Sequence, residues 1–132
     1  MYRYIVAIYL RLSVDDKRVE SMSIESQRLL LRKYAEILGD NVEIIEYVDN
    51  GYSGTNFERP AVQQLLTDVK TYKINCILVK DFSRFGRNSI EVGYFTQQIF
   101  PLFGVRFISV SDNYDSDEHK GDTGGIAVAV KY

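Results

Sequence analysis

The sequence predicts an α/β domain in three layers, with a mainly parallel central sheet and helices on both faces. Short apolar runs alternate along the chain with segments of helical periodicity, each about 10 to 15 residues long. The first run, residues 3–10, is apolar almost throughout after Arg3, which is typical of a central strand covered on both faces. A polar stretch, residues 12–22, follows it as a loop. Strands and helices that alternate in this way form a mainly parallel sheet.

The first helix is expected from Ser23 to Gly39. Ser23 is a good N-cap, and Glu25 lies in the first turn, where a negative charge complements the helix dipole. Its apolar residues recur at helical spacing: Ile24, Leu30, Leu31, Tyr34, Ala35 and Leu38. Val42 to Val48 predicts the second strand, and the turn-rich segment 49–56 after it is too long for a plain connection.

A second helix is expected to open at Arg59-Pro60, because proline is tolerated in a first helical turn. Its inner face carries Ala61, Leu65, Leu66 and Val69. The apolar run Asn75 to Val79 then predicts the third strand.

The third helix is predicted to begin at a cap, either Asn88 or Ser89, and to end at Pro101 with Gly104. Val92, Phe95, Ile99 and Phe100 form its apolar face. Val105 to Val110 predicts the fourth strand.

The remaining residues are less regular. Residues 111–124 are polar and are expected to be loose. The apolar stretch 125–130 is either an edge strand or the start of a helix. We therefore expect one domain over residues 1–125, with residues 126–132 beginning a helix or edge strand that continues in a longer protein.

Composition narrows the function. The net charge of −2, from 16 Lys and Arg against 18 Asp and Glu, excludes the basic surplus of a typical DNA-binding domain, so any nucleic-acid binding is local or belongs to another domain. The single Cys76 cannot form an internal disulfide, which predicts a reducing compartment and a buried thiol. No apolar run approaches the roughly 20 residues of a membrane span, and the N-terminus lacks the charged and apolar regions that are typical of a signal peptide. A cytoplasmic protein without a membrane partner is expected.

The candidate chemistry lies where strands end. Arg11 and Ser13 are two residues apart at the end of the first strand, so an extended chain projects both to the same side. In a parallel sheet the loops that begin near Arg11, Asp49 and Asp81 gather along one edge. The side chains expected there are a hydroxyl nucleophile, Ser13, the cations Arg11, Arg59, Arg84 and Arg87, and the polar residues Gln27, Asp49, Ser53 and Asp81.

An excess of arginines at one edge predicts an anionic ligand. Two guanidinium groups about 6 Å apart repel by roughly 3 kcal/mol at an effective dielectric constant near 20. Arginine donates two parallel hydrogen bonds to phosphate oxygens, and its fixed charge stabilises the charge that grows on phosphorus in a transfer reaction. A serine hydroxyl beside these groups could attack a phosphate in line. The sequence contains no cluster of Cys or His residues, so we expect neither a metal ion nor another cofactor.

Each residue also has an ordinary structural interpretation. Ser13 is compatible with a loop hydroxyl, Gly51 and Gly54 with turn residues, and Gln27 with a solvated first turn. Arg84 and Arg87 are compatible with a solvated face. The combination is more specific than any one of them.

Five motifs together resemble the catalytic domain of the serine recombinases, the resolvase/invertase superfamily. The similarity runs from about residue 3 to residue 125 and is greatest to the large serine recombinases of mobile transposons. The motifs are residues 9–13 (YLRLS), 23–28 (SIESQR), 49–54 (DNGYSG), 58–60 (ERP) and 83–88 (SRFGRN).

The resemblance implies a reaction that cuts and rejoins DNA without a metal, to excise or insert a mobile element. Ser13 matches the nucleophile that forms a 5′-phosphoserine link and releases a 3′-OH. Arg11, Arg84 and Arg87 match the arginines that hold the phosphate, and Arg59 matches a further active-site arginine. Gln27, Asp49 and Ser53 match supporting polar positions.

One position departs from the family pattern. Resolvases carry an aspartate immediately before the first arginine of the late motif, and this sequence has Ser83 there. Asp81 lies two residues earlier, and the identity of the general acid stays open.

The resemblance also implies partners: double-stranded DNA at recombination sites, and self-association into a dimer and a synaptic tetramer in the full-length protein. Both depend in the family on a long helix and DNA-binding domains that follow the catalytic domain. We expect residues 1–132 alone to bind DNA weakly and not to recombine it.

Two other functions remain open from the residues alone. A receiver-like, Mg²⁺-dependent phosphoacceptor domain has the same architecture, and Asp15, Asp16 and Asp81 imitate its acidic pocket. The excess of arginines and the lack of a clear lysine after a fifth strand argue against it. A flavodoxin-like nucleotide binder is the third interpretation, but no glycine-rich phosphate loop follows the first strand.

Overall fold

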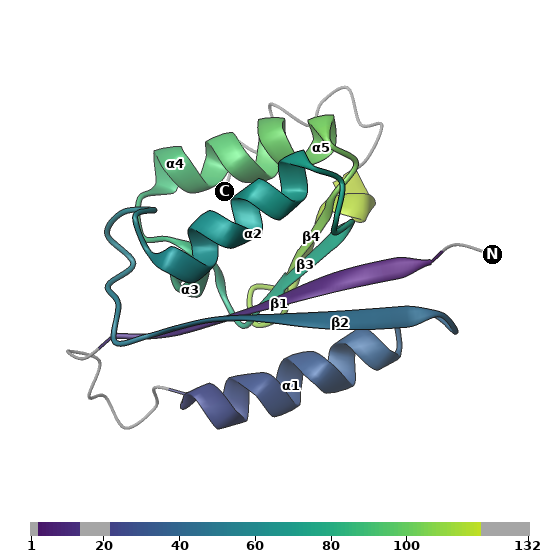
Figure 1. Cartoon of the computed structure of the whole chain (residues 1–132), viewed down its shortest axis with the longest axis horizontal. Helices are drawn as coiled ribbons and strands as arrows, with labels where there is room; N and C mark the ends of the chain where they lie inside the picture. The colour runs from purple at the N-terminus through teal and green to yellow at the C-terminus, as the bar shows by residue number, and fades with distance from the viewer. Residues whose placement is uncertain (1–2, 14–21, 120–132) are drawn as a thin grey trace.

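The computed structural model describes residues 3–13 and 22–119 and is built on a five-stranded sheet (Figure 1). The strands lie in the order β2-β1-β3-β4-β5. Their bounds are β1 Tyr4–Leu12, β2 Val42–Asn50, β3 Cys76–Val79, β4 Arg106–Ser109 and β5 Tyr114–Asp115. The first four strands are parallel to one another, and β5 pairs antiparallel with β4.

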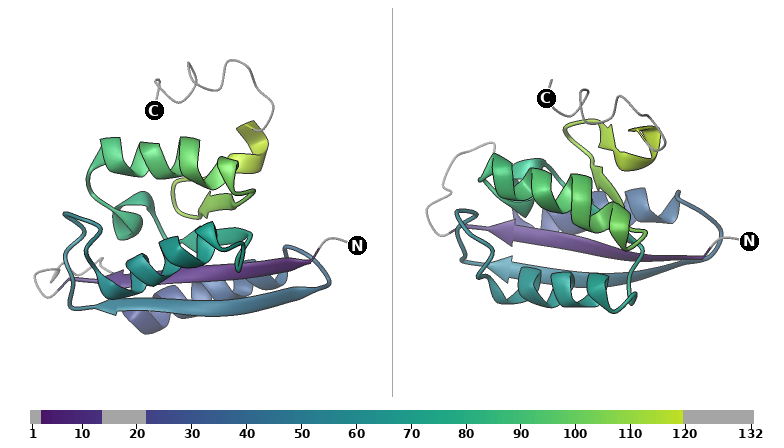
Figure 2. Two further views of the ribbon diagram at one scale, coloured as in Figure 1. Left: turned by 45° about the horizontal axis from the view of Figure 1, so that its top comes forward. Right: turned by 90° about the horizontal axis from the view of Figure 1, so that it is seen from above.

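Helices cover both faces of the sheet (Figures 1 and 2). Helix α1 lies on one face, and α2 and α4 lie on the other. The helices are α1 Ile24–Glu36, α2 Pro60–Lys70, α3 Phe82–Phe85, α4 Ser89–Tyr94, the π-helical turn η1 Phe95–Ile99, α5 Phe100–Leu102 and the 3₁₀ turn η2 Ser116–His119. The predicted three-layer, mainly parallel fold is confirmed.

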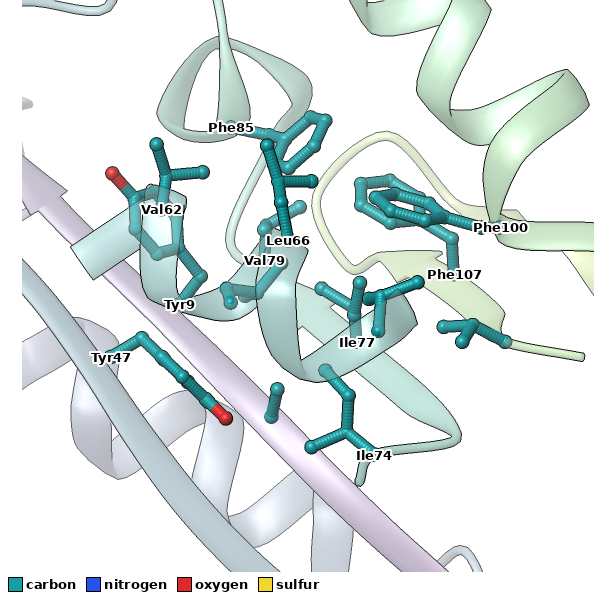
Figure 3. Close-up of a cluster of buried hydrophobic side chains, with 14 of the residues drawn as sticks. Tyr9, Tyr47, Val62, Leu66, Ile74, Ile77, Val79, Phe85, Phe100 and Phe107 are labelled. Atoms are coloured by element: carbon teal, nitrogen blue, oxygen red, sulfur yellow. The ribbon is translucent and has the colours of Figure 1, made fainter. Parts of the chain in front are cut away.

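Strand β1 separates two hydrophobic clusters. Val6, Ile8 and Leu10 pack beneath α1, while Ala7 and Tyr9 belong to the larger cluster beneath α2 (Figure 3). Because side chains alternate along a strand and both faces of β1 are buried, its sequence is a continuous apolar run. Arg11 follows Tyr9 at the next position on the same face, and its contacts also lie on that side.

The two longest strands extend beyond their predicted ends at residue 10 and Val48. The parallel pairing of β1 with β2 continues to the pairs Arg11–Asp49 and Leu12–Asn50. Polar residues therefore occupy the strand ends that sequence patterns assign to loops. The partners that satisfy Arg11 and Asp49 come from other elements, and no local pattern reveals them.

The third helix also differs from its prediction. The helical segment runs through Pro101 to Leu102, so it ends between the two predicted markers, Pro101 and Gly104, but a π-helical turn interrupts it. Proline is tolerated there because it stands in the first turn of α5, directly after the π-helical turn. Gly104, with φ +70°, follows the helix as expected, and Asn88 is the cap, accepting hydrogen bonds from the amides of Ile90 and Glu91.

Three elements have no counterpart in the sequence prediction, and one is the 3₁₀ turn η2, since Ser116–His119 lies in the segment 111–124 that was expected to be loose. Helix α3 has only four residues, too few for a periodic signal. Strand β5 lies in the segment 111–124 that was expected to be loose, and it is held by a two-pronged ion pair between Arg106 and Asp115, with Nε–Oδ1 and Nη2–Oδ2 distances of 3.0 and 2.6 Å.

Residues 120–132 lie outside the described part of the chain, so the division at residue 125 and the element expected at 126–132 stay predictions. Within residues 3–13 and 22–119, no helix is long and apolar enough to cross a membrane.

Candidate functional site

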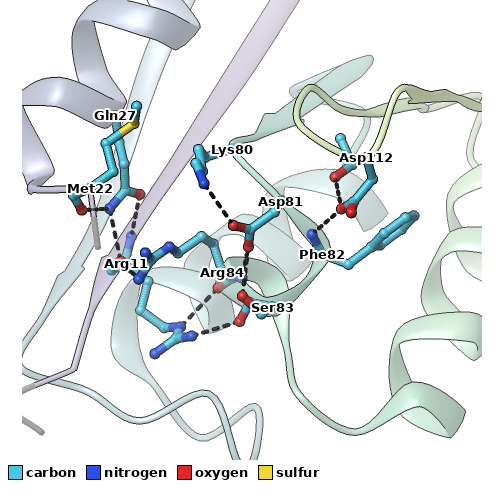
Figure 4. A network of polar contacts seen from close by, with 10 residues as sticks. Arg11, Met22, Gln27, Lys80, Asp81, Phe82, Ser83, Arg84 and Asp112 are labelled. Atoms are coloured by element: carbon cyan, nitrogen blue, oxygen red, sulfur yellow. Dashed lines mark hydrogen bonds and ion pairs between the residues drawn. The ribbon is translucent and has the colours of Figure 1, made fainter. Parts of the chain in front are cut away.

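Arg11 is the centre of the candidate site. Its side chain is fully buried and donates three hydrogen bonds to backbone carbonyls. Nε donates to Arg84 at 2.9 Å and Nη2 to Ser83 at 2.6 Å (Figure 4), and Nη1 donates to Tyr52 at 3.0 Å. These carbonyls belong to the loop after β2 and to α3. Arg11 therefore joins the end of β1 to two segments that are distant in sequence.

Gln27 holds the backbone of Arg11 in place. Its side-chain amide donates to the carbonyl of Arg11 at 3.1 Å, and its Oε1 accepts from the amide of Arg11 at 3.3 Å (Figure 4). Gln27 is buried rather than solvated, so the ordinary interpretation of this first-turn residue is wrong. Helix α1 carries it because Ser23 caps the helix by accepting from the amide of Ser26.

Arg84 and Arg59 complete the buried part of the cluster. Nη1 of Arg84 donates to the carbonyl of Arg11 at 3.3 Å. Nη2 of Arg59 donates to the carbonyl of Phe85 at 2.6 Å, and its guanidinium lies 5.0 Å from the centre of the Phe57 ring. Both arginines are buried, so the solvated interpretation of Arg84 is wrong.

The carboxylate of Asp49 is linked to the guanidinium of Arg59 through the hydroxyl of Tyr9. The hydroxyl of Tyr9 donates to Oδ2 of Asp49 at 2.6 Å and accepts from Nη1 of Arg59, also at 2.6 Å. Asp49 also accepts from the amides of Ala61 and Val62, the first turn of α2. Burial raises the pKa of Tyr9 well above its ordinary value, as does the hydrogen bond to Asp49, so the hydroxyl stays a neutral donor.

Arg87 lies at the exposed edge of the cluster. Its amide donates to the carbonyl of Gly54 at 2.9 Å. Gly54 is needed there because an added Cβ would lie 2.8 Å from Nη2 of Arg11 and 3.2 Å from Cγ of Arg87. This glycine therefore allows a close approach, whereas Gly51, with φ +91°, is a turn glycine.

The four arginines are close enough to influence one another. The pKa of Arg11 falls to about 10, first because of burial and then because of the charge of Arg59, with contributions from Arg87 and Arg84 that Tyr9 partly opposes. The structure thus gathers Arg11, Arg59, Arg84 and Arg87 at the edge where β1 and β3 end. Backbone carbonyls, which carry partial negative charge, stabilise the three buried guanidinium groups.

The two candidate serines differ in their surroundings. Ser13 lies just past the end of β1 and is only 7% exposed. Ser53 is exposed, and its hydroxyl takes part in a local turn with Thr55, accepting from the amide of Thr55 at 3.2 Å. Its neighbours in the same loop, Tyr52 and Gly54, contact the arginine cluster through their backbone carbonyls.

Known proteins with this architecture identify the chain. The family model of the resolvase N-terminal domain matches residues 6–128. The chain belongs to the resolvase family of serine recombinases. A Bacillus subtilis (strain 168) protein named "Putative DNA recombinase" is 32% identical over 82 residues, which are 62% of this chain and 16% of that protein. The chain thus spans about a sixth of the length of that relative.

Two solved structures resemble this resolvase-family domain along most of its length. The N-terminal catalytic domain of TP901-1 integrase is 31% identical, with a TM-score of 0.77, and the match covers 96% of this chain and 88% of that one. A resolvase family site-specific recombinase from Streptococcus pneumoniae is also 31% identical, with a TM-score of 0.74 over 98% and 85% of the two chains.

The region before Arg84 contains Ser83, at the position where the resemblance led us to expect an aspartate, and Asp81. Asp81 Oδ1 accepts from the Ser83 hydroxyl at 2.6 Å, and Oδ2 accepts from Lys80 Nζ at 3.2 Å (Figure 4). Burial alone would raise the pKa of Asp81, but the hydrogen bonds from Ser83, Lys80 and the Arg84 amide lower it below its ordinary value. Asp81 is therefore ionised at neutral pH.

The acidic pocket expected for a receiver domain would consist of Asp15, Asp16 and Asp81. Asp15 and Asp16 lie outside the described part of the chain. Among the residues that the structure does describe, no three His, Cys, Asp or Glu side chains are grouped to hold a metal ion.

Three contributors to the resolvase site escaped the sequence interpretation. Tyr9 precedes Arg11 by two residues on the same strand face, a signal that could have been used. Asp112 accepts from the amide of Phe82 at 2.8 Å across 30 residues, and no local pattern marks it. The carbonyl of Tyr52 is a backbone group and leaves no trace in sequence.

Proposed function

We propose that this chain is the catalytic domain of a larger site-specific DNA recombinase and that Ser13 is its nucleophile. The observation that carries the proposal is the cluster of Arg11, Arg59, Arg84 and Arg87 beside the end of β1, in a chain of the resolvase family. Ser13 follows Arg11 by two residues. A clustered positive charge next to a hydroxyl suits the transfer of a phosphodiester.

The proposed reaction is a transesterification. The oxygen of Ser13 attacks the scissile phosphorus, the bond from phosphorus to the 3′-oxygen breaks, and the 5′-phosphate stays bound to Ser13. The serine proton is lost to a base, and the departing 3′-oxygen takes up a proton to become a 3′-OH. The 3′-OH of a second strand reverses these steps and rejoins the DNA, which excises or inserts a mobile element.

The arginines stabilise the charge of the pentacovalent phosphorus in this proposal, so that no metal cofactor is required. Arg11 uses three of the five N–H groups of a guanidinium on backbone carbonyls, and the other two can reach phosphate oxygens only after the rearrangement that exposes Ser13, because the side chain is fully buried. Arg84, which is also buried, and the exposed Arg87 supply further donors. Gln27, Arg59 and Asp49 keep Arg11 and its surroundings in position, and Ser53, Asp81 and Ser83 support the loops that contact it.

Ser13 is reached only after a rearrangement in this proposal. A residue that is 7% exposed does not present its hydroxyl to a DNA backbone. We infer that binding to paired DNA sites, with assembly of a dimer and then a synaptic tetramer, exposes Ser13. The net charge of −2 agrees with weak DNA binding by residues 1–132 and with strong phosphate contacts elsewhere in the complete protein.

The test uses the complete recombinase with duplexes that carry its paired sites. We expect a covalent protein–DNA product, bound through a 5′-phosphate, that also forms in excess EDTA. Ser13→Ala should give none, and Arg87→Ala should reduce the rate about 100-fold or more, as loss of one oxyanion donor does in other enzymes. A covalent product that persists in Ser13→Ala would refute the assignment of the nucleophile.

A further inference from the structure

Helix α3 is a short element held at both ends by charged side chains. It spans Phe82–Phe85 and carries Arg84. Its C-terminal carbonyls accept from two arginines: those of Ser83 and Arg84 from Arg11, and that of Phe85 from Arg59. A helix of one turn is not stable by itself, so its contacts decide where it lies.

Two carboxylates hold the opposite end. Oδ1 of Asp81 accepts from the Ser83 hydroxyl at 2.6 Å and from the Arg84 amide at 3.1 Å. Oδ2 of Asp112 accepts from the Phe82 amide at 2.8 Å and from the Ser109 hydroxyl at 2.7 Å (Figure 4). Asp112 comes from the turn between β4 and β5, so a second, distant loop fixes the same end.

The charges at the two ends match the helix dipole. Negative side chains meet the exposed amides, and guanidinium groups meet the exposed carbonyls. A shift of α3 toward either end would lengthen hydrogen bonds at the other. The position of the Ser83 and Arg84 carbonyls, and through them of the Arg11 guanidinium, therefore depends on Asp81 and Asp112.

We propose that Asp81 and Asp112 are positioning residues that hold α3 so that Arg11 and Arg84 face the phosphate. This inference rests on the proposed function for its effect on catalysis. Both oxygens of Asp81 accept hydrogen bonds within the protein. It therefore acts through α3 rather than by giving a proton to the departing 3′-oxygen.

The catalytic test compares asparagine and alanine at each position in the complete recombinase. Asparagine keeps a side-chain oxygen that accepts from the α3 amides, and alanine does not. We expect Asp112→Ala and Asp81→Ala to slow formation of the Ser13–DNA product by about tenfold to 100-fold, which is typical of a displaced catalytic group, with little change in half-saturating DNA. The asparagine variants should stay within a few-fold of wild type and keep its pH profile.

Asp40→Ala is the matched control, because it removes the same charge from an exposed position after α1. Its rate should equal that of wild type. If Asp81→Asn is as slow as Asp81→Ala and loses one limb of the pH profile, Asp81 is a proton donor and the proposal is wrong for it. Wild-type rates in both alanine variants would refute the proposal altogether.

A second measurement does not depend on catalysis. The Nε–H of Arg11, buried against the Arg84 carbonyl, should exchange slowly with solvent in the 132-residue chain, as followed by NMR. Asp112→Ala and Asp81→Ala should speed this exchange at least about tenfold, and the asparagine variants should not. Unchanged exchange in the alanine variants would refute the proposal that Asp81 and Asp112 hold α3 in position. If exchange changes as expected but wild type forms no DNA adduct, the proposed function is wrong, while the role of Asp81 and Asp112 in holding α3 is supported.

Discussion

Arg11 and Arg84 each donate a side-chain hydrogen bond to the backbone carbonyl of the other. Nε of Arg11 lies 2.9 Å from the Arg84 oxygen, and Nη1 of Arg84 lies 3.3 Å from the Arg11 oxygen. The two residues are 73 positions apart in sequence. The two positively charged side chains thus stay close together because each guanidinium binds the backbone carbonyl of the other residue. These two hydrogen bonds also fix the end of β1 to α3.

This reciprocal pair should show strong energetic coupling. We expect Arg11→Gln and Arg84→Gln to destabilise the domain non-additively, with a coupling energy of about 0.5 to 3 kcal/mol, because the residues share partners. Urea unfolding of the two single variants and the double variant measures it. Arg84→Gln combined with Arg3→Gln is the control. Arg3 precedes the opposite end of β1, so these two effects should add, and full additivity in the first pair would contradict the coupling.

Substitution of Gly54 should damage the cluster. The added Cβ of Gly54→Ala would lie 2.8 Å from Nη2 of Arg11, a group held by hydrogen bonds to carbonyls. We expect a loss of about 1 to 3 kcal/mol in the free energy of unfolding, the usual cost of overpacking. Gly93→Ala is the matched control, since its Cβ meets its nearest neighbour at 3.9 Å and alanine favours the helix by about 1 kcal/mol. Equal effects of the two substitutions would contradict the close approach at Gly54.

The hydroxyl of Tyr9 should matter more than that of Tyr47. Both donate to a buried carboxylate at 2.6 Å, Tyr9 to Asp49 and Tyr47 to Asp68, but only Tyr9 also accepts from Arg59. We expect Tyr9→Phe to cost about 2 to 3 kcal/mol in unfolding free energy and Tyr47→Phe about 1.5, because hydrogen bonds to charged groups are among the stronger ones.

Activity separates the two tyrosines further. In the complete recombinase, Tyr9→Phe should also slow formation of the covalent DNA product, while Tyr47→Phe should not. Parallel losses of activity in both variants would show that the Tyr9 bridge has no special part in the site.

The domain should lose stability in alkaline solution through Cys76. Burial raises the pKa of this thiol from 9.0 to about 12. Between these values the unfolded chain has lost the proton and the folded chain has kept it. The stability that Cys76 contributes is therefore fully present below about pH 9 and falls, by at most about 1.4 kcal/mol per pH unit, as pH rises toward 12.

Urea unfolding of wild type and Cys76→Ala at several pH values measures this effect. The free energy of unfolding of wild type minus that of Cys76→Ala should fall as pH rises above 9. Tyr9 and Tyr47, whose pKa values are also raised by burial, contribute equally to both proteins and cancel in this difference. A difference that stays constant across this range would contradict the prediction.

Much of the fold could be predicted from local patterns. The continuous apolar run of β1 reports burial on two faces, and Ser23 marks the start of α1 because an N-cap acts through its own helix. The strand ends were placed too early because Asp49 is satisfied by α2 and Arg11 by α3. Helix α3 was missed because its stability depends on contacts at its two ends rather than on periodicity.

The sequence by itself determined the alternation of strands and helices, and therefore the edge where the arginines meet. It also carried the motifs of the resolvase family. Only the tertiary structure decided what those arginines contact: carbonyls of Tyr52, Ser83, Arg84 and Phe85, and the hydroxyl of Tyr9. The physical reason is that a guanidinium bonds to whichever acceptors the folded chain brings within reach, and backbone carbonyls are the same in every residue type.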